Sequence, residues 1–350
     1  MTAAKPRVLV CEARTPFVTG NAEYLIRVLV GQLTRRGYDA ELVSLPFSAR
    51  PRDGLLSHAA AWRLLDLSES NNTPIDLVIT TRFPTYFVRH PKKVAWLVRQ
   101  YRSAYELWGT PGSDNDENKM DVGMREHLGR LDTQMLNENE EIFTVGRNTT
   151  ARLKRCNGLT SEPLPHPPRL ADQLRSGPYD NYVLSVSDLE RIQRTDLIIR
   201  AMTRVDFDIR LVVVGDGTER APLVQLATEL GVLDRVDMVG PVEDAELLRL
   251  YEQALCMAHV PYDGEDGAVA LEGLLARRPV VTTHDSSGTL EFVDNGVNGL
   301  VCFPDPQGLA DGINRLASDR QLAASLGAAG YERARQITWD GVIERLTRVL

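Results

Sequence analysis

The chain has 350 residues, of which 43% are hydrophobic and 25% are charged, and its formal net charge is -8. This length predicts two globular domains, and the acidic balance excludes a protein that tracks nucleic-acid phosphates, because such binding needs a basic surface. No apolar run approaches the roughly 18 residues of a membrane span. No signal-type segment precedes the first apolar run, so we expect a cytoplasmic protein without a transmembrane segment.

Short apolar runs alternate with segments of helical periodicity in the first half of the chain. The expected strands are residues 8–12, 40–44, 77–80, 94–98 and 142–145. After Gly20 and Asn21, apolar residues from Leu25 to Leu33 form a helical stripe that ends at Gly37. The polar segment 109–119 predicts a solvated loop, because it lacks the glycine and the final glutamate that a calcium loop requires. The alternation is typical of a parallel sheet with crossover helices.

The second half repeats this pattern after a proline-rich segment, 163–168, which predicts a linker because its prolines lack backbone donors. We therefore expect α/β domains at residues 1–165 and 169–333, followed by a C-terminal segment at 334–350 with an amphipathic helix after Trp339. The expected strands of the second domain are residues 182–186, 210–214, 236–239, 256–260, 280–283 and 300–303.

Several kinds of site are disfavoured because the chain lacks their motifs. The four cysteines include no C-x-x-C pair, and the six histidines do not cluster at the spacing of metal ligands. There is no G-x-S-x-G elbow, no H-E-x-x-H helix and no G-x-x-x-x-G-K loop. A disulfide framework, a metalloenzyme and a serine hydrolase are therefore poor interpretations of this sequence.

Three turns follow expected strands of the second half, where α/β sheets bind their ligands. The turn at 215–217 would bring backbone N–H groups close to a phosphate, and a tight structural turn explains it equally well. The segment 261–272 contains Gly267 and ends at Glu272, whose carboxylate can accept two hydrogen bonds from a vicinal diol such as ribose. The alternative for Glu272 is a solvated glutamate near a helix start. The turn at 285–289 fits a sugar contact or an ordinary capped turn.

The order of these motifs resembles that of the retaining glycosyltransferases of family 4, in a bacterial subgroup. The resemblance implies an α/β fold of GT-B type, in which two Rossmann-like doubly wound domains face each other across a cleft that holds a nucleotide sugar. It also implies that the C-terminal helix crosses back to the N-terminal domain, and that neither a metal nor another cofactor is needed. The segments that carry the resemblance are 20–24, 82–86, 101–109, 215–217, 239–242, 261–272, 279–281 and 290–300.

The resemblance assigns roles to residues of the second domain. Glu272 matches the acid that binds the donor ribose, and Val242 lies where the base is contacted. The backbone that meets the diphosphate and the sugar matches Gly267, Ala268 and Val269. The family's first acid falls on Gly264, so either flanking carboxylate, Asp263 or Glu265, is expected to contact the sugar hydroxyls.

The sequence departs from the family at the diphosphate and acceptor positions. The family's paired Arg and Lys are replaced by Asp188 and Gln193, which leaves Arg191 or Arg194 as substitutes. The first loop has Gly20 and Asn21 in place of two glycines, and Tyr101 stands where the subgroup has a histidine near the acceptor. Tyrosine is a poor base at neutral pH unless its pKa shifts strongly.

The predicted function is transfer of a sugar, with retention, from an activated, nucleotide-linked donor to a small-molecule or glycan acceptor. The alternative is a non-catalytic GT-B subunit that acts as the partner of an active enzyme, which the departures at Asp188 and Gln193 would also fit. A GT-B enzyme that forms a C–N or C–S bond is a third interpretation. The sequence is compatible with a homodimer and with a partner glycosyltransferase.

Overall fold

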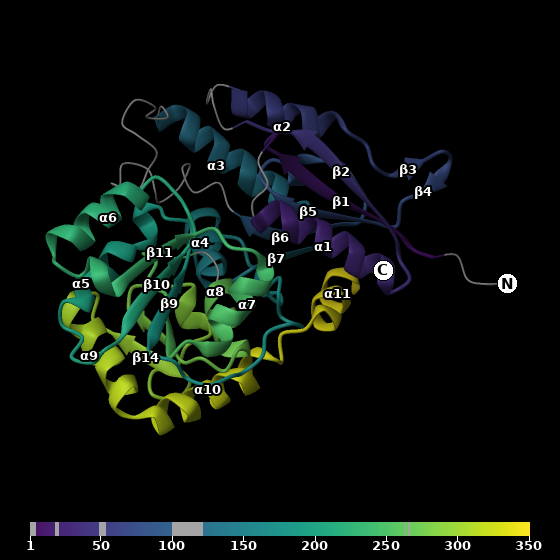
Figure 1. Ribbon diagram of the computed structural model, residues 1–350. Coiled ribbons are helices and arrows are strands. Elements are labelled where there is room, and N and C mark those ends of the chain that lie inside the picture. The colour runs from purple at the N-terminus through teal and green to yellow at the C-terminus, as the bar shows by residue number, and fades with distance from the viewer. Residues whose placement is uncertain (1–4, 18–20, 49–53, 100–121, 263, 265–266) are drawn as a thin grey trace. The chain divides into compact units, whose positions relative to one another are not determined.

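The computed structural model describes residues 5–17, 21–48, 54–99, 122–262, 264 and 267–350. The chain divides into two compact units (Figure 1). Unit 1 comprises Met1–Pro165 and Trp339–Leu350, and unit 2 comprises His166–Thr338. No described helix is both long and apolar enough to cross a bilayer.

The central sheet of unit 1 is parallel and has the strand order β2-β1-β5-β6-β7-β8. Its strands are β1 (Arg7–Arg14), β2 (Asp39–Pro46), β5 (Leu77–Arg82), β6 (Lys93–Arg99), β7 (Glu141–Thr144) and β8 (Glu162–Pro163). A small antiparallel pair, β3 (Glu69–Ser70) and β4 (Thr73–Pro74), lies outside this sheet. The five strands predicted in the first half are confirmed, and the start of the predicted linker forms the short edge strand β8.

Helices cover both faces of this sheet. Successive residues of a strand point to opposite faces, so neighbouring residues of β6 pack against different helices. On one face Val94 and Trp96 pack with α1 (Asn21–Arg35) and α11 (Trp339–Thr347). On the other face Ala95 and Leu97 pack with α2 (Gly54–Leu64), α3 (Val122–Leu136), α4 (Arg147–Asn157) and the 3-10 turn η1 (Thr85–Phe87). The stripe predicted for the first helix is confirmed, since Leu25, Ile26, Leu29 and Leu33 are buried.

The C-terminal helix α11 belongs to unit 1 although it follows unit 2 in the sequence. Val342, Ile343 and Leu346 complete the apolar layer that α1 forms on the sheet. Polar bonds hold both ends of the helix, from Arg36 Nε to Asp340 (2.8 Å) and from Arg348 Nε to Glu141 Oε1 (2.6 Å). The preceding helix, α10 (Arg320–Ala334), ends within the expected segment 334–350, so α11 occupies only its later part.

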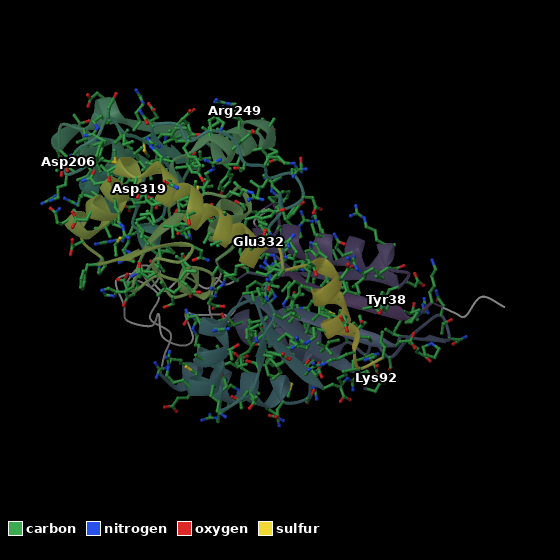
Figure 2. The ribbon with its side chains drawn as sticks, turned by 90° about the horizontal axis from the view of Figure 1, so that it is seen from below. Tyr38, Lys92, Asp206, Arg249, Asp319 and Glu332 are labelled. Atoms are coloured by element: carbon green, nitrogen blue, oxygen red, sulfur yellow. The ribbon has the colours of Figure 1, made fainter. Side chains whose placement is uncertain are left out.

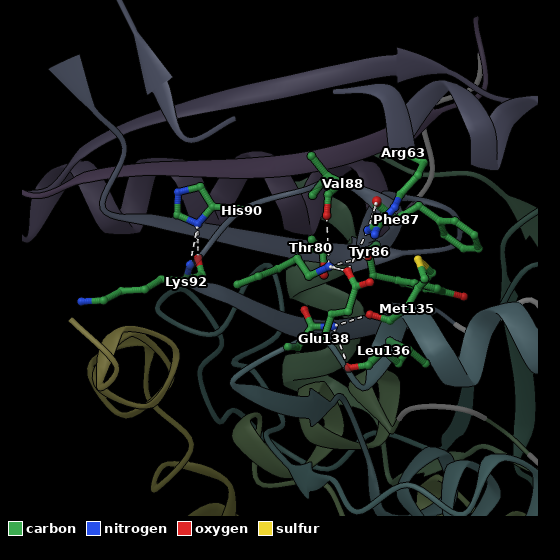
Figure 3. Close-up of polar contacts among 12 residues, drawn as sticks. Arg63, Thr80, Tyr86, Phe87, Val88, His90, Lys92, Met135, Leu136 and Glu138 are labelled. Atoms are coloured by element: carbon green, nitrogen blue, oxygen red, sulfur yellow. Dashed lines mark hydrogen bonds and ion pairs between the residues drawn. The ribbon is translucent and has the colours of Figure 1, made fainter. Parts of the chain in front are cut away.

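The first residue of β6, Lys93, is a buried lysine. Its partners Tyr86, Val88 and Glu138 are labelled in Figure 3. Lys93 Nζ donates to the carbonyls of Tyr86 (2.9 Å) and Val88 (3.0 Å) and lies 3.3 Å from Glu138 Oε2. Arg63 of α2 donates to the same carboxylate oxygen at 2.7 Å. Burial lowers the pKa of Lys93, and the nearby carboxylate of Glu138 partly offsets this shift. The cluster lies at the amino end of its strand and serves to join η1, α2 and the end of α3.

Unit 2 has a second parallel sheet with the strand order β11-β10-β9-β12-β13-β14. The strands are β9 (Tyr182–Val186), β10 (Arg210–Val214), β11 (Val236–Gly240), β12 (Cys256–Ala258), β13 (Val280–Thr283) and β14 (Gly299–Cys302). All six predicted strands are confirmed. Strand β12 ends at Ala258, two residues earlier than expected. The carbonyl of Val260, two residues beyond this end, accepts a hydrogen bond from the side chain of Arg194.

Two apolar layers enclose the sheet of unit 2. One packs against α5 (Thr195–Met202), α6 (Arg220–Glu229) and α9 (Pro306–Ser318), and the other against α7 (Asp244–Gln253) and α8 (Ala268–Leu275). Exposed charged side chains such as Arg249 of α7, Asp319 at the start of α10 and Glu332 of α10 lie on the outer surface of unit 2 (Figure 2). In each sheet the strand order reverses at one point, between β1 and β5 and between β9 and β12, and ligands of open α/β sheets bind at such points.

Candidate functional site

The loops that follow β9 and β12 meet at the carboxyl end of the sheet of unit 2. The amide of Tyr262, after β12, donates to the carbonyl of Ile192, after β9, at 2.8 Å. These strands are neighbours at the point where the strand order reverses. The contact therefore marks the place where an α/β sheet of this topology binds its ligand.

Arg194 connects three loops at this edge. Its Nε donates to the carbonyl of Val260 at 2.8 Å. Its two terminal nitrogens donate to both carboxylate oxygens of Asp285, at 2.8 and 2.7 Å, and one of them also donates to Thr283 Oγ1 at 2.9 Å. Partial burial would raise the pKa of Asp285, but hydrogen bonds from Arg194 and Thr283 outweigh it and hold that pKa below its ordinary value. The substitute cation expected at Arg194 is thus already paired with a carboxylate.

The glycines of the turn at 215–217 allow this loop to touch the loop after β9. Gly215 has a φ of +129°, and a Cβ on it would overlap the carbonyl of Ser187. A Cβ on Gly217 would lie 2.5 Å from the carbonyl oxygen of Leu189. Glu190 further joins the two loops, because its carboxylate accepts from the amide and the hydroxyl of Thr218. Of the two explanations of this turn, the structure supports a close structural contact.

Helix α8 begins beside the turn that follows β13. A Cβ on Gly267 would lie 2.7 Å from Cε2 of Phe292 and 2.9 Å from the carbonyl oxygen of Gly288, so only glycine fits without rearrangement. Ala268 and Val269 are the first two residues of the helix. Backbone N–H groups in a first helical turn point toward the start of the helix, where an anion can accept hydrogen bonds from them.

Glu272 lies in the second turn of α8 and is half-buried. The hydroxyl of Tyr251, on α7, donates to its Oε2 at 2.6 Å. Tyr251 is fully buried, and burial together with the nearby carboxylate raises its pKa well above the ordinary value, so the phenol remains a donor. Tyr251 thereby fixes the orientation of the carboxylate. Val242 packs half-buried against the same apolar layer of unit 2.

The two positions that depart from the family pattern differ in exposure. Asp188 is exposed immediately after β9, in the loop that contacts the 215–217 turn. Gln193 is half-buried, and within the described part of the chain its Oε1 has no hydrogen-bond partner. The structure thus brings Asp188, Gln193 and Arg194 together in one loop at the carboxyl edge.

Other predicted site residues fall outside the described residues. These are Gly20, Tyr101, Asp263 and Glu265, and the segment 109–119 is likewise not described. Asn21 begins α1, and its side chain is not described. Among the residues that the structure describes, no group of three or more His, Cys, Asp or Glu side chains could hold a metal ion.

Some contacts of the site have no local sequence signal. Arg194 and Asp285 are separated by 91 residues, and Tyr251 and Glu272 by 21. The first residue of the turn at 285–289, Asp285, binds an arginine of another loop, and this bond leaves both predictions for the turn, a ligand contact and a capped turn, open. Only the fold brings these partners together.

An open groove of about 400 Å³ lies beside these loops. Its walls are α5 and α6, and Glu190 and Arg191 lie at its loop end. Its lining mixes carboxylates, guanidinium groups and apolar residues such as Leu223 and Leu226, and it includes neither Gly267 nor Glu272. The groove is therefore separate from the entrance to α8.

Unit 1 also has an arginine at its reversal point, between β1 and β5. Arg82, the last residue of β5, donates to the carbonyl of Ala13 in β1 and to Glu23 in the first turn of α1, the latter at 2.7 Å. Nearby Glu12 is buried, and its Oε2 accepts from Ser44 Oγ at 3.1 Å. Both carboxyl edges thus contain an arginine that bonds to a neighbouring loop or strand.

Comparison with known proteins relates this arrangement to a family. Residues 169–333, nearly all of unit 2, match the family described as glycosyl transferases group 1. A D-inositol 3-phosphate glycosyltransferase of Corynebacterium diphtheriae is 27% identical over 221 residues, which cover 60% of this chain and 48% of that protein. The chain thus matches about half the length of this curated relative.

Solved structures resemble the whole chain. Sucrose-phosphate synthase from Thermosynechococcus elongatus has a TM-score of 0.79 at 17% identity and covers 98% of both chains. Anabaena HepE, solved in complex with UDP, has a TM-score of 0.70 at 17% identity and covers 98% of this chain and 99% of its own. With the two six-stranded parallel sheets, these likenesses confirm the predicted α/β fold of GT-B type. Residues 169–333 are thus similar to the group 1 glycosyltransferases.

Proposed function

We propose that this protein is a glycosyltransferase that moves a sugar, with retention, from a nucleotide-linked donor to a small-molecule or glycan acceptor. The observation that carries the proposal is the arrangement at α8: Gly267 opens the helix beside the turn after β13, and Tyr251 orients the carboxylate of Glu272 one turn later. This arrangement lies inside the segment that matches the group 1 family.

Each part of this arrangement has a role in the proposed reaction. Glu272 accepts hydrogen bonds from the two ribose hydroxyls of the donor. The amides of Gly267, Ala268 and Val269 stabilise the charge on the departing phosphate. The bond from the anomeric carbon to the phosphate oxygen breaks while the acceptor oxygen bonds to the same face of the sugar. The leaving phosphate oxygen takes the acceptor's proton, and no metal or other cofactor is proposed.

The remaining assignments rest on the resemblance to family 4. Val242 contacts the base, and Asp263 or Glu265 contacts the sugar hydroxyls. Gly20 and Asn21 belong to the loop that approaches the donor, and Tyr101 lies near the acceptor. The proposed setting is cytoplasmic, either as a homodimer or beside a partner glycosyltransferase.

Asp188 makes the mode of donor binding unusual. An exposed carboxylate near 4 Å from a phosphate oxygen would oppose it by on the order of 4 kcal/mol at an effective dielectric constant of about 20. We infer that the donor either carries its phosphate away from Asp188 or is held mainly through Glu272 and the start of α8. The departures at Asp188 and Gln193 are also the observation that favours the non-catalytic subunit.

Calorimetry with UDP-, GDP- and ADP-sugars tests the proposal. We expect one nucleotide to bind the protein, and Glu272→Ala to weaken that binding at least tenfold while abolishing turnover. Tyr251→Phe keeps the ring but removes the bond to Glu272, and it should give a smaller loss. Glu332→Gln, on the exposed surface of α10, is the matched control. No binding to any nucleotide, together with stable association with another glycosyltransferase, would favour the non-catalytic subunit.

A further inference from the structure

The side chain of Arg194 makes its hydrogen bonds to other loops and not to the loop that contains it. The hydrogen bonds of its guanidinium run to residues after β12 and to residues at or after the end of β13, namely Val260, Pro261, Thr283, Asp285 and Ser286. Its guanidinium also lies 5.7 Å from the centre of the Tyr262 ring. The backbone of Arg194 bonds locally, to Arg191 and Leu197, whereas its side chain bonds to the other loops and fixes the distance between them.

The backbone at this position does not require an arginine. Arg194 has φ 53° and ψ 38°, the left-handed region that glycine adopts without strain and other residues adopt at a cost. It also sits between the short 3-10 turn Arg191–Gln193 and the start of α5. Only the side chain explains an arginine here, and strained backbone of this kind is concentrated at functional sites.

The charge of Arg194 is matched within the protein. Both of its terminal nitrogens donate to Asp285, and this bidentate arrangement is the strongest interaction that a guanidinium and a carboxylate can make. The side chains of Arg194 and Asp285 are only 19% and 26% exposed. A neutralised pair cannot supply the positive charge that a phosphate needs, so the arrangement suits positioning better than direct phosphate binding.

We propose that Arg194 is a positioning residue that sets the spacing of the loops after β9, β12 and β13 around the donor. This inference rests on the proposed function for its link to the donor. The loops that Arg194 holds include the bond from Tyr262 to Ile192 and the turn whose Gly288 amide donates to Gly264 at 3.0 Å. That turn also packs on Gly267, so the tether extends to the start of α8. Fixing the loops before the ligand arrives lowers the entropic cost of binding.

The first test needs no ligand. Arg194→Met keeps most of the stem and removes the guanidinium, and we expect it to speed hydrogen exchange of the Tyr262 amide about tenfold. Arg194→Gly removes the side chain and relieves the backbone, and it should have the same effect. Arg200→Met is the matched control, because Arg200 is exposed and its ion pair with Asp196 stays within α5. Unchanged exchange in both Arg194 variants would overturn the inference.

The second test uses UDP, GDP and ADP as probes in calorimetry. For the nucleotide that the wild type binds, we expect Arg194→Met and Asp285→Asn each to raise Kd about tenfold or more, and Arg194→Lys to restore part of the loss. Equal losses in Arg194→Met and Asp285→Asn support a positioning pair. A loss confined to the Arg194 variants, with normal Tyr262 exchange, would make Arg194 a direct phosphate ligand and overturn the inference.

The two tests separate this inference from the proposed function. If the wild type binds no nucleotide, the proposed function fails, while the exchange measurement still decides whether Arg194 holds the loops. If the wild type binds a nucleotide and the variants bind it equally well, the link between Arg194 and the donor is wrong and the proposed function stands. Should Arg194→Met fail to fold, Asp285→Asn provides both measurements.

Discussion

The carboxyl edges of the two sheets are closed in different ways. In unit 1 Arg82 reaches from the end of β5 to Glu23 in α1, and both side chains are almost fully buried, at 12% and 7% exposure. In unit 2 the corresponding pair, Arg194 and Asp285, lies on loops and is more exposed. Burial decides what such a pair contributes: a buried pair is costly to break, whereas a partly exposed pair contributes little stability and is suited to holding a site.

Glycines show the same contrast. At Gly31 and Gly54 in unit 1, an added Cβ would meet no atom within 4 Å. At Gly215 and Gly267 in unit 2, an added Cβ would collide with a carbonyl oxygen or an aromatic ring. At these two positions the loops of unit 2 pack closely on a carbonyl group or an aromatic ring, which a side chain would prevent. A ligand at this edge meets main-chain groups held in place, as an anion site requires.

Removing the buried pair of unit 1 should have the largest effect on stability. Arg82→Met takes away the cation beside Glu23 and the donor to Ala13, and we expect a loss of about 3 kcal/mol in the free energy of unfolding. All four tryptophans belong to unit 1, so tryptophan fluorescence in urea reports this unit alone. Arg27→Met, on the exposed face of α1, should change stability by less than about 0.5 kcal/mol. Equal urea midpoints for the Arg82→Met and Arg27→Met variants would show that the burial of Arg82 does not make it more important for stability than Arg27.

Adding one methyl group should distinguish the glycines of the two units. Gly267→Ala forces Phe292 or the Gly288 carbonyl to move, and we expect a loss of about 2 kcal/mol by circular dichroism in urea. Gly31→Ala lies in the exposed interior of α1 and should gain about 0.5 kcal/mol, because alanine is the better helix former. A neutral Gly267→Ala would mean that the start of α8 is not closely packed against the neighbouring turn.

The partly exposed pair of unit 2, Arg194 and Asp285, should contribute less to stability than the buried pair of unit 1, and its contribution should depend on pH. Asp285→Asn is expected to cost about 1 kcal/mol at neutral pH. The folded-state pKa of Asp285 lies below its ordinary value of 3.8, so the carboxylate stabilises the fold at pH values above 3.8. This contribution is lost as the pH falls through the lowered pKa. Urea unfolding of both proteins between pH 7 and pH 3 should show the difference shrinking at the acidic end. A difference that grows there would contradict the ion pair.

The smallest expected effect concerns the reactivity of the cysteine thiols, because the cysteines in the strands at both sheet edges are protected by burial. Cys11 in β1 and Cys256 in β12 occupy the strands at the two reversal points, and both are fully buried. Burial raises the pKa of Cys256 to about 12 and that of half-buried Cys302 to about 11. Only Cys156 is exposed, so a thiol reagent at pH 8 should modify one group per native chain. A Cys156→Ser variant should show no rapid reaction.

The strands could be predicted because buried parallel strands appear in a sequence as short apolar runs, as at residues 280–283. The edge strand β8 was missed, since two residues that include Pro163 carry no such run. The entrance to α8 at Gly267 and Glu272 was recognised through the order of motifs. The pairing of Tyr251 with Glu272 and that of Asp285 with Arg194 were not recognised, because hydrogen bonds between distant residues depend on which loops the topology makes neighbours.

The position of α11 has a consequence for biosynthesis. A ribosome completes unit 2 before it adds Val342, Ile343 and Leu346, which the apolar layer of unit 1 needs. Unit 1 is therefore begun first and finished last, and its α1 face stays uncovered throughout translation of the intervening residues. Nascent chains released before Trp339 should be recognised by chaperones or proteases through that uncovered face, however well unit 2 has folded.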